Sequence, residues 1–552
     1  MTRILRSETK KLQNSDNLSS KLTASKMSKI IKRTDKKFLE INNEGNQKSG
    51  IWNINSIMSN IFAYTDRKDL IEFNTACKKW NNLINPIIHE SIKLDSRWNV
   101  KWQPAYKSIN NAAKIDAHVV ECISNNAKYA SLVKKFKFNY KLNPLRAFEF
   151  FTTFRFISSL TIEDCDMSQD QFLGIINPLT QLQELDISCL KIKNYFRKDL
   201  IKDAIQLPSS LKKLKLHNIS LKNDPELFIQ TINSHTNLVE FSSWQSDDDF
   251  LEPFCMHYPS LIKIEFSSNH LHYYDSLFTV FEHNPQLVGL KLLFGYRNTE
   301  FLSQLSNYLT NLEEVNLTER YDLNADNTVV DLNLSQPTKI KKLYLQWDRL
   351  SNSSLNSILL NCPHLEELNL NPHTHYKQFN PISFNNISIF FNLKKLAISC
   401  DKLSEDAFDT LLLSCPHLNE LSIILPCNWK EAVKSIYNKC GNLQRLNIIP
   451  SFGMSCHERD AFYQEFYQSE FFTGSPSCKF NLTHLIFEQF KVHGSKAEYF
   501  KNFDKLRSIK YPYQKYRSFS KFNKFGIEMD LWSDYELNSN DNDTYYDIEL
   551  KR

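Results

Sequence analysis

The chain has 552 residues, and its hydrophobic content of 41% is enough for a large buried core. Its formal charge is only +5, and residues 1–48 hold 12 Lys and Arg against 5 Asp and Glu, so the rest carries −2. A nearly neutral body does not favour nucleic-acid binding. Ten glycines are too few for chemistry built on glycine-rich phosphate loops, and no apolar run reaches the ~18 residues of a membrane span.

The 12 cysteines lie between Cys77 and Cys478 and include no CxxC pair. The first residues lack the apolar stretch of a secretion signal. We therefore expect reduced, mostly buried thiols in a soluble protein of the cytoplasm, the nucleus or both, with no membrane partner.

Residues 1–48 are rich in Lys, Ser, Asn and Thr and have no sustained apolar face, which predicts a disordered basic tail. The basic run at 29–37 fits either a nuclear-import signal or a solvated tail, and the tail is the favoured interpretation.

Residues 51–94 are expected to form a small helical unit. Apolar residues recur at steps of three and four in two stretches: Ile54, Ile57, Met58, Ile61 and Phe62, then Leu70, Phe73, Cys77, Trp80 and Ile84. Asp66 or Asp69 is suited to cap the second helix, and Pro86 is expected to close the unit before a short strand at 92–94. A unit this small buries too little apolar surface to be stable alone, so we expect it to pack against a neighbouring domain or a partner.

After a linking segment at 95–128, with a helix near 105–128, one pattern dominates residues 129–528. It reads apolar-x-x-apolar-x-apolar, and its fifteen copies begin at Val133, Ile157, Leu182, Leu211, Leu238, Leu261, Leu287, Leu312, Ile340, Leu365, Leu393, Leu418, Leu443, Leu482 and Leu506. The copies follow one another after 23–29 residues, except for one step of 39. This period is typical of one strand and one helix per repeat, stacked so that the strands form a continuous parallel sheet over a shared core.

Two motifs resemble a known family. The residues Ile57-Met58, Ile61-Phe62, Asp69-Leu70 and Cys77-Lys78-Lys79-Trp80 resemble an F-box. The corners Cys362–Leu365 and Cys415–Leu418, both Cys-Pro-His-Leu, resemble the cysteine-containing, ribonuclease-inhibitor-like repeats of F-box/leucine-rich-repeat proteins. The resemblance implies an α/β leucine-rich-repeat solenoid, a horseshoe of parallel strands with outer helices, preceded by a small all-α F-box-like unit.

The resemblance also implies a function, that of substrate-recognition subunit of a Skp–cullin–F-box ubiquitin ligase. Such a protein is not an enzyme and needs no cofactor: it binds a Skp-type adaptor, and through it a cullin, and presents a protein substrate for ubiquitin-dependent degradation. The residues that it assigns to adaptor contact are Ile54, Ile57, Met58, Ile61, Phe62, Leu70, Cys77 and Trp80.

A second interpretation is a protein-binding scaffold that does not enter a ligase. F-boxes usually open with Leu-Pro and a Glu, whereas this chain has Asn53-Ile54 and Ser56. A third, a regulator of GTPases, requires a catalytic Arg or Asn on an exposed loop, and the sequence singles out no such residue.

The inner face of the solenoid is predicted from equivalent strand positions. One column reads Lys263, Gly289, Glu314, Lys342, Glu367, Lys395, Glu420 and Arg445, and its sign alternates from Glu314 onward. Alternating charges on neighbouring strands support the sheet and make a poor dock for a strongly charged partner. Substrate contacts are therefore expected at less polar positions, namely Leu293, Tyr344, Gln346, Ile424 and Ile449.

We find no catalytic motif such as GxSxG or HExxH and no phosphate loop. His364 and His417 accompany Cys362 and Cys415, but Pro ends the preceding helix and a buried thiol fits a corner, so a metal site is not favoured. His373 and His375 are expected in an exposed loop.

Three segments depart from the repeat. The long step contains residues 451–478, in which Phe462, Phe466 and Phe471 could share one helix, and it fits a binding loop or a longer helix equally well. Residues 500–525 interleave Lys and Arg with Phe and Tyr, which favours a terminal cap over a single-stranded nucleic-acid site. Residues 529–552 are acidic and are expected to form a loose tail.

Overall fold

The computed structural model describes residues 55–94, 108–139, 142–167, 169–189, 191–192, 206–219, 225–244, 248–268, 274–294, 299–319, 332–346, 351–370, 392–399, 405–426, 429–450, 456–490, 495–514, 532, 535–541 and 545–552. The predicted tail at 1–48, the basic run within it, Ile54 and the loop with His373 and His375 lie outside them. The chain divides into two compact units, Met1–Glu90 and Ser91–Arg552. We call them the helical unit and the solenoid unit and describe each by itself.

The described residues of the helical unit, 55–90, form three helices, α2 (Asn55–Ala63), α3 (Arg67–Phe73) and α4 (Lys78–Ile88). They enclose a small core of Met58, Phe62, Leu70, Ile84 and Ile88, with Phe73, Trp80, Leu83 and Ile87 packed against it. Asp66 caps α3, as one of the two predicted alternatives, because its side chain accepts hydrogen bonds from the backbone N–H groups of Lys68 and Asp69.

The prediction of one continuous second helix was wrong. The chain breaks after α3, where the Asn74 side chain donates to Asn85 Oδ1 (3.0 Å) and its backbone C=O accepts from the Asn81 side chain (3.3 Å). Cys77 then caps α4, with its Sγ accepting from the backbone N–H of Trp80 at 3.5 Å. Pro86 does not close the unit either, since it lies inside α4.

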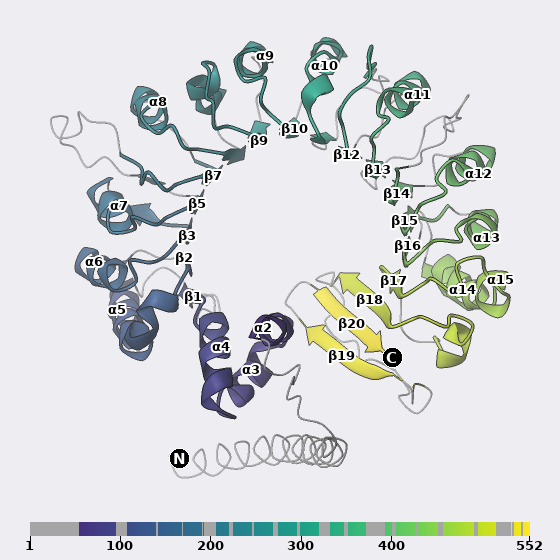
Figure 1. The fold of residues 1–552 in the computed structure, drawn as a ribbon, viewed down its shortest axis with the longest axis horizontal. Coiled ribbons are helices and arrows are strands. Elements are labelled where there is room, and N and C mark those ends of the chain that lie inside the picture. The colour runs from purple at the N-terminus through teal and green to yellow at the C-terminus, as the bar shows by residue number, and fades with distance from the viewer. Residues whose placement is uncertain are drawn as a thin grey trace, which may run out of the picture. The chain divides into compact units, whose positions relative to one another are not determined.

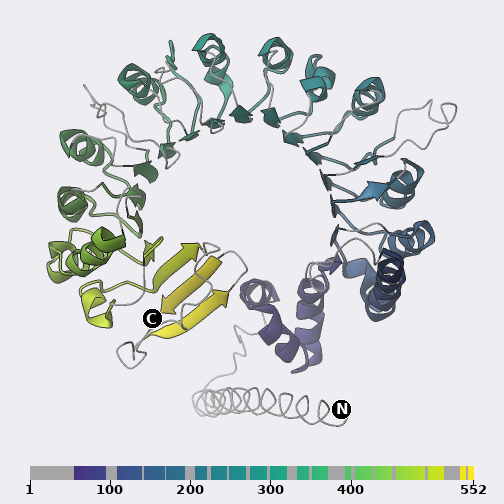
Figure 2. The same cartoon turned by 180° about the vertical axis from the view of Figure 1, so that it is seen from behind.

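The solenoid unit is organised around one long sheet whose parallel strands follow one another in chain order (Figures 1 and 2). The strands are β1 (Ser91–Leu94), β2 (Lys135–Phe138), β3 (Ser159–Glu163), β5 (Glu184–Ser188), β7 (Lys213–His217), β8 (Glu240–Trp244), β9 (Lys263–Ser268), β10 (Gly289–Phe294), β11 (Glu314–Glu319), β12 (Lys342–Gln346), β13 (Glu367–Leu370), β14 (Lys395–Ser399), β15 (Glu420–Ile424), β16 (Arg445–Ile449), β17 (His484–Phe487) and β18 (Ser508–Gln514). From β2 to β18, every strand begins two residues after a predicted repeat start. The fold prediction is therefore confirmed.

Helices return the chain between the strands and cover the outer side of the sheet (Figure 1). The α-helices are α5 (Ser108–Asn126), α6 (Pro144–Thr153), α7 (Gln169–Ile176), α8 (Pro225–Asn233), α9 (Tyr274–His283), α10 (Thr299–Ser306), α11 (Asn352–Asn361), α12 (Glu405–Leu413), α13 (Trp429–Lys439), α14 (Cys456–Tyr467) and α15 (Glu470–Thr473). Some repeats use 3₁₀ turns instead, namely η4 (Ala127–Leu132), η5 (Asp248–Phe254), η6 (Leu309–Asn311) and η8 (Ala497–Phe500). A second, two-stranded sheet joins β4 (Asp166–Met167) to β6 (Lys191–Ile192).

The apolar residues of the repeat fill one continuous core between sheet and helices. Within a strand such as β3, Leu160 and Ile162 are buried while the residues beside them are half-exposed. The copy that starts at Leu238 departs from this pattern. It places Ser243 at a core position, fully buried, and the Ser243 hydroxyl has no hydrogen-bond partner.

Two predicted boundaries need correction. The strand at 91–94 belongs to the solenoid unit, because β1 pairs in parallel with β2 along its whole length. The acidic tail is not loose either: β19 (Glu536–Asp541) and β20 (Tyr545–Lys551) form an antiparallel hairpin that extends the sheet from β18. Trp532, Ile548 and Leu550 are buried, so the hairpin covers the last repeat.

The segment with the long step is part of the core. Phe462 and Phe466 lie on α14 and Phe471 lies on α15, so the three do not share one helix, but all are buried. The longer helix rather than the binding loop is thus supported for the described part of 451–478. In the next segment Phe500 and Phe503 are also buried, as expected for a terminal cap.

Candidate binding surfaces

Three rows of side chains cross the inner face of the solenoid unit. Successive side chains on a strand alternate between core and surface, so the first, third and fifth residues of each strand project from the sheet. On β9 these residues are Lys263, Glu265 and Ser267, and parallel pairing aligns them with their counterparts on every neighbouring strand. We call the three alignments the first, second and third rows.

The first row is a ladder of alternating charge. From β5 to β16 it reads Glu184, Lys213, Glu240, Lys263, Gly289, Glu314, Lys342, Glu367, Lys395, Glu420 and Arg445. The predicted alternation is confirmed and extends further toward the N-terminus. Ion pairs join Lys213 to Glu240 at 2.8 Å and Lys342 to Glu314 at 3.1 Å.

Gly289 is the only first-row residue from β5 to β16 that adds no side chain, and its neighbour fills the space. Lys263 extends across β10 and donates to Glu314 Oε2 at 2.6 Å, two strands away. A Cβ atom at Gly289 would lie 2.9 Å from Cγ of Lys263. The hydrogen bond from Lys263, together with that from Lys342, holds the pKa of Glu314 below its usual value despite partial burial.

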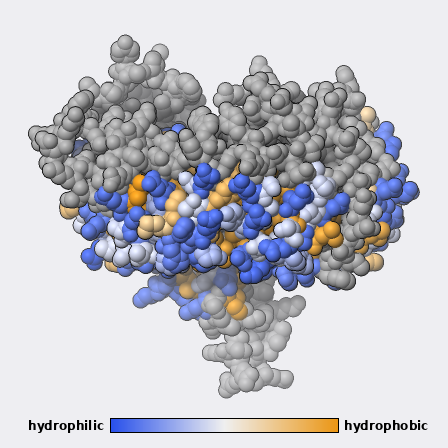
Figure 3. Space-filling view, turned by 90° about the horizontal axis from the view of Figure 1, so that it is seen from above, coloured by the Kyte–Doolittle hydropathy of each residue, from blue (hydrophilic) through white to orange (hydrophobic). Residues whose placement is uncertain are grey.

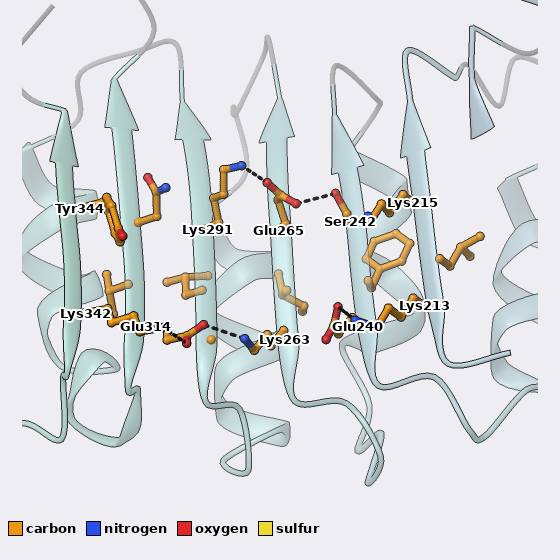
Figure 4. A pocket seen from close by; sticks show the side chains of 17 residues that line it. Lys213, Lys215, Glu240, Ser242, Lys263, Glu265, Lys291, Glu314, Lys342 and Tyr344 are labelled. Carbon is orange, nitrogen blue, oxygen red and sulfur yellow. Dashed lines mark hydrogen bonds and ion pairs between the residues drawn. The ribbon is translucent and has the colours of Figure 1, made fainter. Parts of the chain in front are cut away.

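Three second-row residues, Ser242, Glu265 and Lys291, contact one another in turn, and the first and last of them also contact Trp244 of the third row. The Trp244 indole N–H donates to the Ser242 hydroxyl at 3.0 Å, and Ser242 donates to Glu265 at 3.0 Å. Glu265 pairs with Lys291, whose Nζ lies 4.3 Å from the centre of the Trp244 ring. Figure 4 shows Ser242, Glu265 and Lys291 in line across three strands.

The third row carries no Asp, Glu, Lys or Arg at any described position from β5 to β16. It contains Ser188, His217, Trp244, Ser267, Leu293, Thr318, Gln346, Ser399, Ile424 and Ile449. Four of the five predicted substrate-contact residues, Leu293, Gln346, Ile424 and Ile449, therefore share one row. Tyr344 lies in the second row, where it donates to Glu367 at 3.1 Å.

The predicted substrate-contact residues differ in how far their side chains are exposed. Leu293 and Tyr344 are half-exposed, whereas Ile424 and Ile449 are only 5% and 7% exposed. The two isoleucines thus offer little surface to a partner, contrary to expectation, although neither belongs to the core cluster between sheet and helices. Sequence reasoning missed His217 and Trp244, which the register places in the same row.

The inner face is hollowed between β7 and β12. A depression of about 320 Å³ lies there, and its lining includes Lys213, Glu240, Lys263, Glu314 and Tyr344 (Figure 4). Each of the five lysines in its lining pairs with a glutamate, four of them with a glutamate of the lining and Lys215 with Glu184 beside it. On the side seen from above in Figure 3, hydrophilic and hydrophobic residues are interspersed.

The helical unit offers a second candidate surface. Ile57 and Ile61, one turn apart on α2, are 37% and 44% exposed, and Ile71 on α3 is 53% exposed. Sequence reasoning missed Ile71, because it followed only the face that begins at Leu70. An exposed apolar surface of this kind can serve as a partner-binding site, and Ile57 and Ile61 lie on neighbouring turns of the same helix.

The remaining predicted adaptor contacts are placed differently. Met58, Phe62 and Leu70 are buried in the unit's own core, which leaves them little surface for a partner. Trp80 is half-buried, with its ring 5.5 Å from that of Phe62, while Cys77 is exposed.

Reactive chemistry is not concentrated at either surface. Burial raises the pKa of the Cys362 thiol to about 11 and that of Cys415 to about 12, so both stay protonated. Among the described residues, no three His, Cys, Asp or Glu side chains are close enough to hold a metal ion. No helix in the same part of the chain is long and apolar enough to cross a membrane.

Comparisons with known proteins agree with the repeat. The Leucine Rich Repeat family model matches residues 339–363 and 392–416. The comparison with curated proteins finds no match.

Two similar solved structures are TLR13 in complex with the RNA ssRNA13 and the complex of Rad7 and Elc1 from yeast. TLR13 shares 14% identity with a TM-score of 0.26, over 70% of this chain and 51% of the receptor, so the chain spans about half its length. The Rad7–Elc1 structure shares 13% identity with a TM-score of 0.33, over 86% of this chain and 93% of that one. No residue role is carried over from either. The strand register and the family match together identify the solenoid unit as an α/β leucine-rich-repeat solenoid.

Proposed function

We propose that the protein is a substrate-recognition subunit of a Skp–cullin–F-box ubiquitin ligase. In this role it forms no bond itself. The helical unit binds a Skp-type adaptor, and through it a cullin, while the inner face of the solenoid binds a protein substrate. The gain comes from effective concentration, because a substrate held by the solenoid keeps its lysines near the activated ubiquitin.

The observation that carries the proposal is the pair of exposed isoleucines on α2, in a unit that resembles an F-box. Ile57 and Ile61 stand one turn apart on one helix, whose other side supplies Met58 and Phe62 to the core. Burying each exposed isoleucine under a partner contributes on the order of 1 kcal/mol. The proposed adaptor contact therefore centres on Ile57, Ile61 and Ile71, with Cys77 at its edge.

The test is equilibrium binding of the full-length chain to a purified Skp-type adaptor. Replacing both Ile57 and Ile61 with Asp should weaken binding at least tenfold, whereas Asn60→Asp, an exposed change on the same helix, should change it less than threefold. Thermal unfolding of each variant checks that the helical unit remains folded. Undiminished binding by the folded double variant, or no binding by the unchanged chain, would contradict the proposal.

A second candidate is a protein-binding scaffold that does not enter a ligase. It is favoured by Asn53-Ile54 and Ser56, which depart from the F-box opening, and by the burial of three of the eight expected contact residues. The same experiment separates the two functions, because a scaffold does not bind the adaptor.

A further inference from the structure

The third row between β5 and β11 differs from the rest of the inner face in combining exposure with lack of charge. Ser188, His217, Trp244, Leu293 and Thr318 are all half-exposed, and Ser267 beside Trp244 is buried. Beyond β12, the described residues of this row, Ser399, Ile424 and Ile449, are buried. The third-row side chains that a partner can contact therefore lie between β5 and β11. We call this part of the row, from Ser188 to Thr318, the neutral track.

Among the described second-row residues from β5 to β11, both lysines are paired with carboxylates. Lys215 pairs with Glu184 at 2.9 Å, and Lys291 pairs with Glu265, while Asp186 lies 3.6 Å from the His217 ring. An acidic group brought here would lose its hydration without meeting an unpaired lysine of this row, which is costly. The second row thus disfavours acidic partners.

The side chain of Trp244, at the middle of the track, is fixed by two contacts. Its N–H is bound by Ser242, and Lys291, which belongs to β10, lies against its ring. Trp244 belongs to β8, so the contact is made above β9, where Lys291 also pairs with Glu265. A large side chain fixed in this way loses little entropy when a partner covers it, and tryptophan is among the residues that most often dominate interfaces.

The length of the track indicates what it can hold. Six neighbouring strands spaced by ~4.8 Å give a track of about 24 Å, which equals about seven residues of extended chain at ~3.3 Å each. An extended segment matches the track, because the track is a single line of side chains and an extended chain can place one residue after another along it.

We propose that the neutral track binds an extended, uncharged segment of the substrate protein, about seven residues long, with aliphatic or hydroxyl side chains and with Trp244 as its anchor. This inference rests on the proposed role of the solenoid as a substrate receptor. It adds the class of segment recognised and the residues that recognise it, and it assigns the ion pairs of the first and second rows to excluding charged competitors.

The experiment is selection of random 12-residue peptides, displayed on phage, against the immobilised full-length chain. Enriched peptides should share an uncharged stretch of about seven residues. A synthetic peptide carrying that stretch should lose at least tenfold in affinity with Trp244→Ala, and its affinity should change less than twofold between 50 and 500 mM NaCl.

Two further variants keep the result interpretable. Leu293→Asp leaves Trp244 in place and adds an unpaired charge to the track, so it should also weaken binding at least tenfold. Phe480→Ala removes an aromatic side chain that is 62% exposed outside the track and should leave binding unchanged. Thermal unfolding checks that each variant is folded.

Three outcomes would overturn the inference: enrichment of charged stretches, equal binding to the Trp244→Ala variant, or no peptide that depends on the track. No adaptor is present in this selection. A failure of adaptor binding therefore contradicts the proposed function without changing the peptide result, and the reverse also holds.

Discussion

Lys263 forms its hydrogen bond with Glu314 by crossing the intervening strand at Gly289, 2.6 Å from donor to acceptor. The contact restores charge alternation at the one first-row position from β5 to β16 that has no side chain. Glu314 thereby binds two lysines, Lys263 from one side and Lys342 from the other.

Gly289→Ala should reveal this crossing. Its new Cβ displaces the Lys263 side chain, which costs about 0.5 kcal/mol because the pair is partly solvent-exposed. The alanine also lowers the conformational entropy of the unfolded chain, which stabilises the fold by a similar amount. The net change in the free energy of unfolding should therefore be close to zero. In a Lys263→Ala background only the gain remains, and Gly289→Ala should stabilise by about 0.5 kcal/mol. Urea unfolding of the four proteins measures the coupling, and strict additivity would show that the two residues are independent.

The pH dependence of Glu314 has a defined sign. Its folded-state pKa is lowered from the ordinary value of 4.5, so its stabilising effect is fully present above pH 4.5 and is lost as pH falls through the folded value. The stability difference between the unchanged chain and Glu314→Gln should be constant near neutral pH and shrink in acid. It should stay below about 1 kcal/mol, because the side chain is 38% exposed. In a chain lacking both Lys263 and Lys342, partial burial is left to raise the pKa of Glu314, so this pH dependence should reverse its sign.

Replacing the neighbouring serines Ser242 and Ser243 of β8 with alanine should change the free energy of unfolding in opposite directions. Ser243 is buried in the core with an unpaired hydroxyl, so Ser243→Ala should raise the free energy of unfolding by about 1 kcal/mol. Ser242 connects Trp244 to Glu265, so Ser242→Ala should lower it by a similar amount. Urea unfolding measures both, and a destabilised Ser243→Ala would contradict the assignment of that hydroxyl.

Cysteine reactivity should distinguish the exposed thiol of the helical unit from two buried thiols of the solenoid unit. Burial raises the pKa of Cys478 to about 12 and that of Cys362 to about 11, whereas Cys77 is exposed. Iodoacetamide at pH 8 should therefore modify Cys77 in the folded chain and leave Cys362 and Cys478 intact until urea unfolds it. Mass spectrometry of the digested protein reads each site. Bound adaptor should slow modification of Cys77 if that residue borders the contact.

The repeat was predictable because the strands place apolar residues at their second and fourth positions from the copy at Val133 to that at Leu506. The exception in composition is Ser243, and the exception in burial is the half-buried Leu370. The terminal hairpin was missed because acidic composition outweighed a visible alternation at Tyr546, Ile548 and Leu550. That alternation is the signal that could have found it. The break after Phe73 was missed because apolar spacing carries through the Asn74–Cys77 turn.

The candidate surfaces could be predicted only in part. The charge alternation of the first row depends only on which residue occupies the same position in each repeat, so it could be predicted from the sequence. The contacts of Trp244 join three strands that lie 23–26 residues apart in the sequence, and they depend on side-chain directions that periodicity does not contain. Burial of Ile424 and Ile449 on the inner face likewise does not follow from the repeat pattern, which assigns only the second and fourth strand positions to the core.

The measurement that tests the central proposal most directly is the mass of the complex formed when the purified full-length chain is mixed with a Skp-type adaptor and a cullin. Size-exclusion chromatography with light scattering should detect one complex containing a single copy of each, and that complex should lose the chain when Ile57 and Ile61 are both replaced with Asp. A chain that elutes alone, while adaptor and cullin still bind each other, would contradict its role as a ligase subunit.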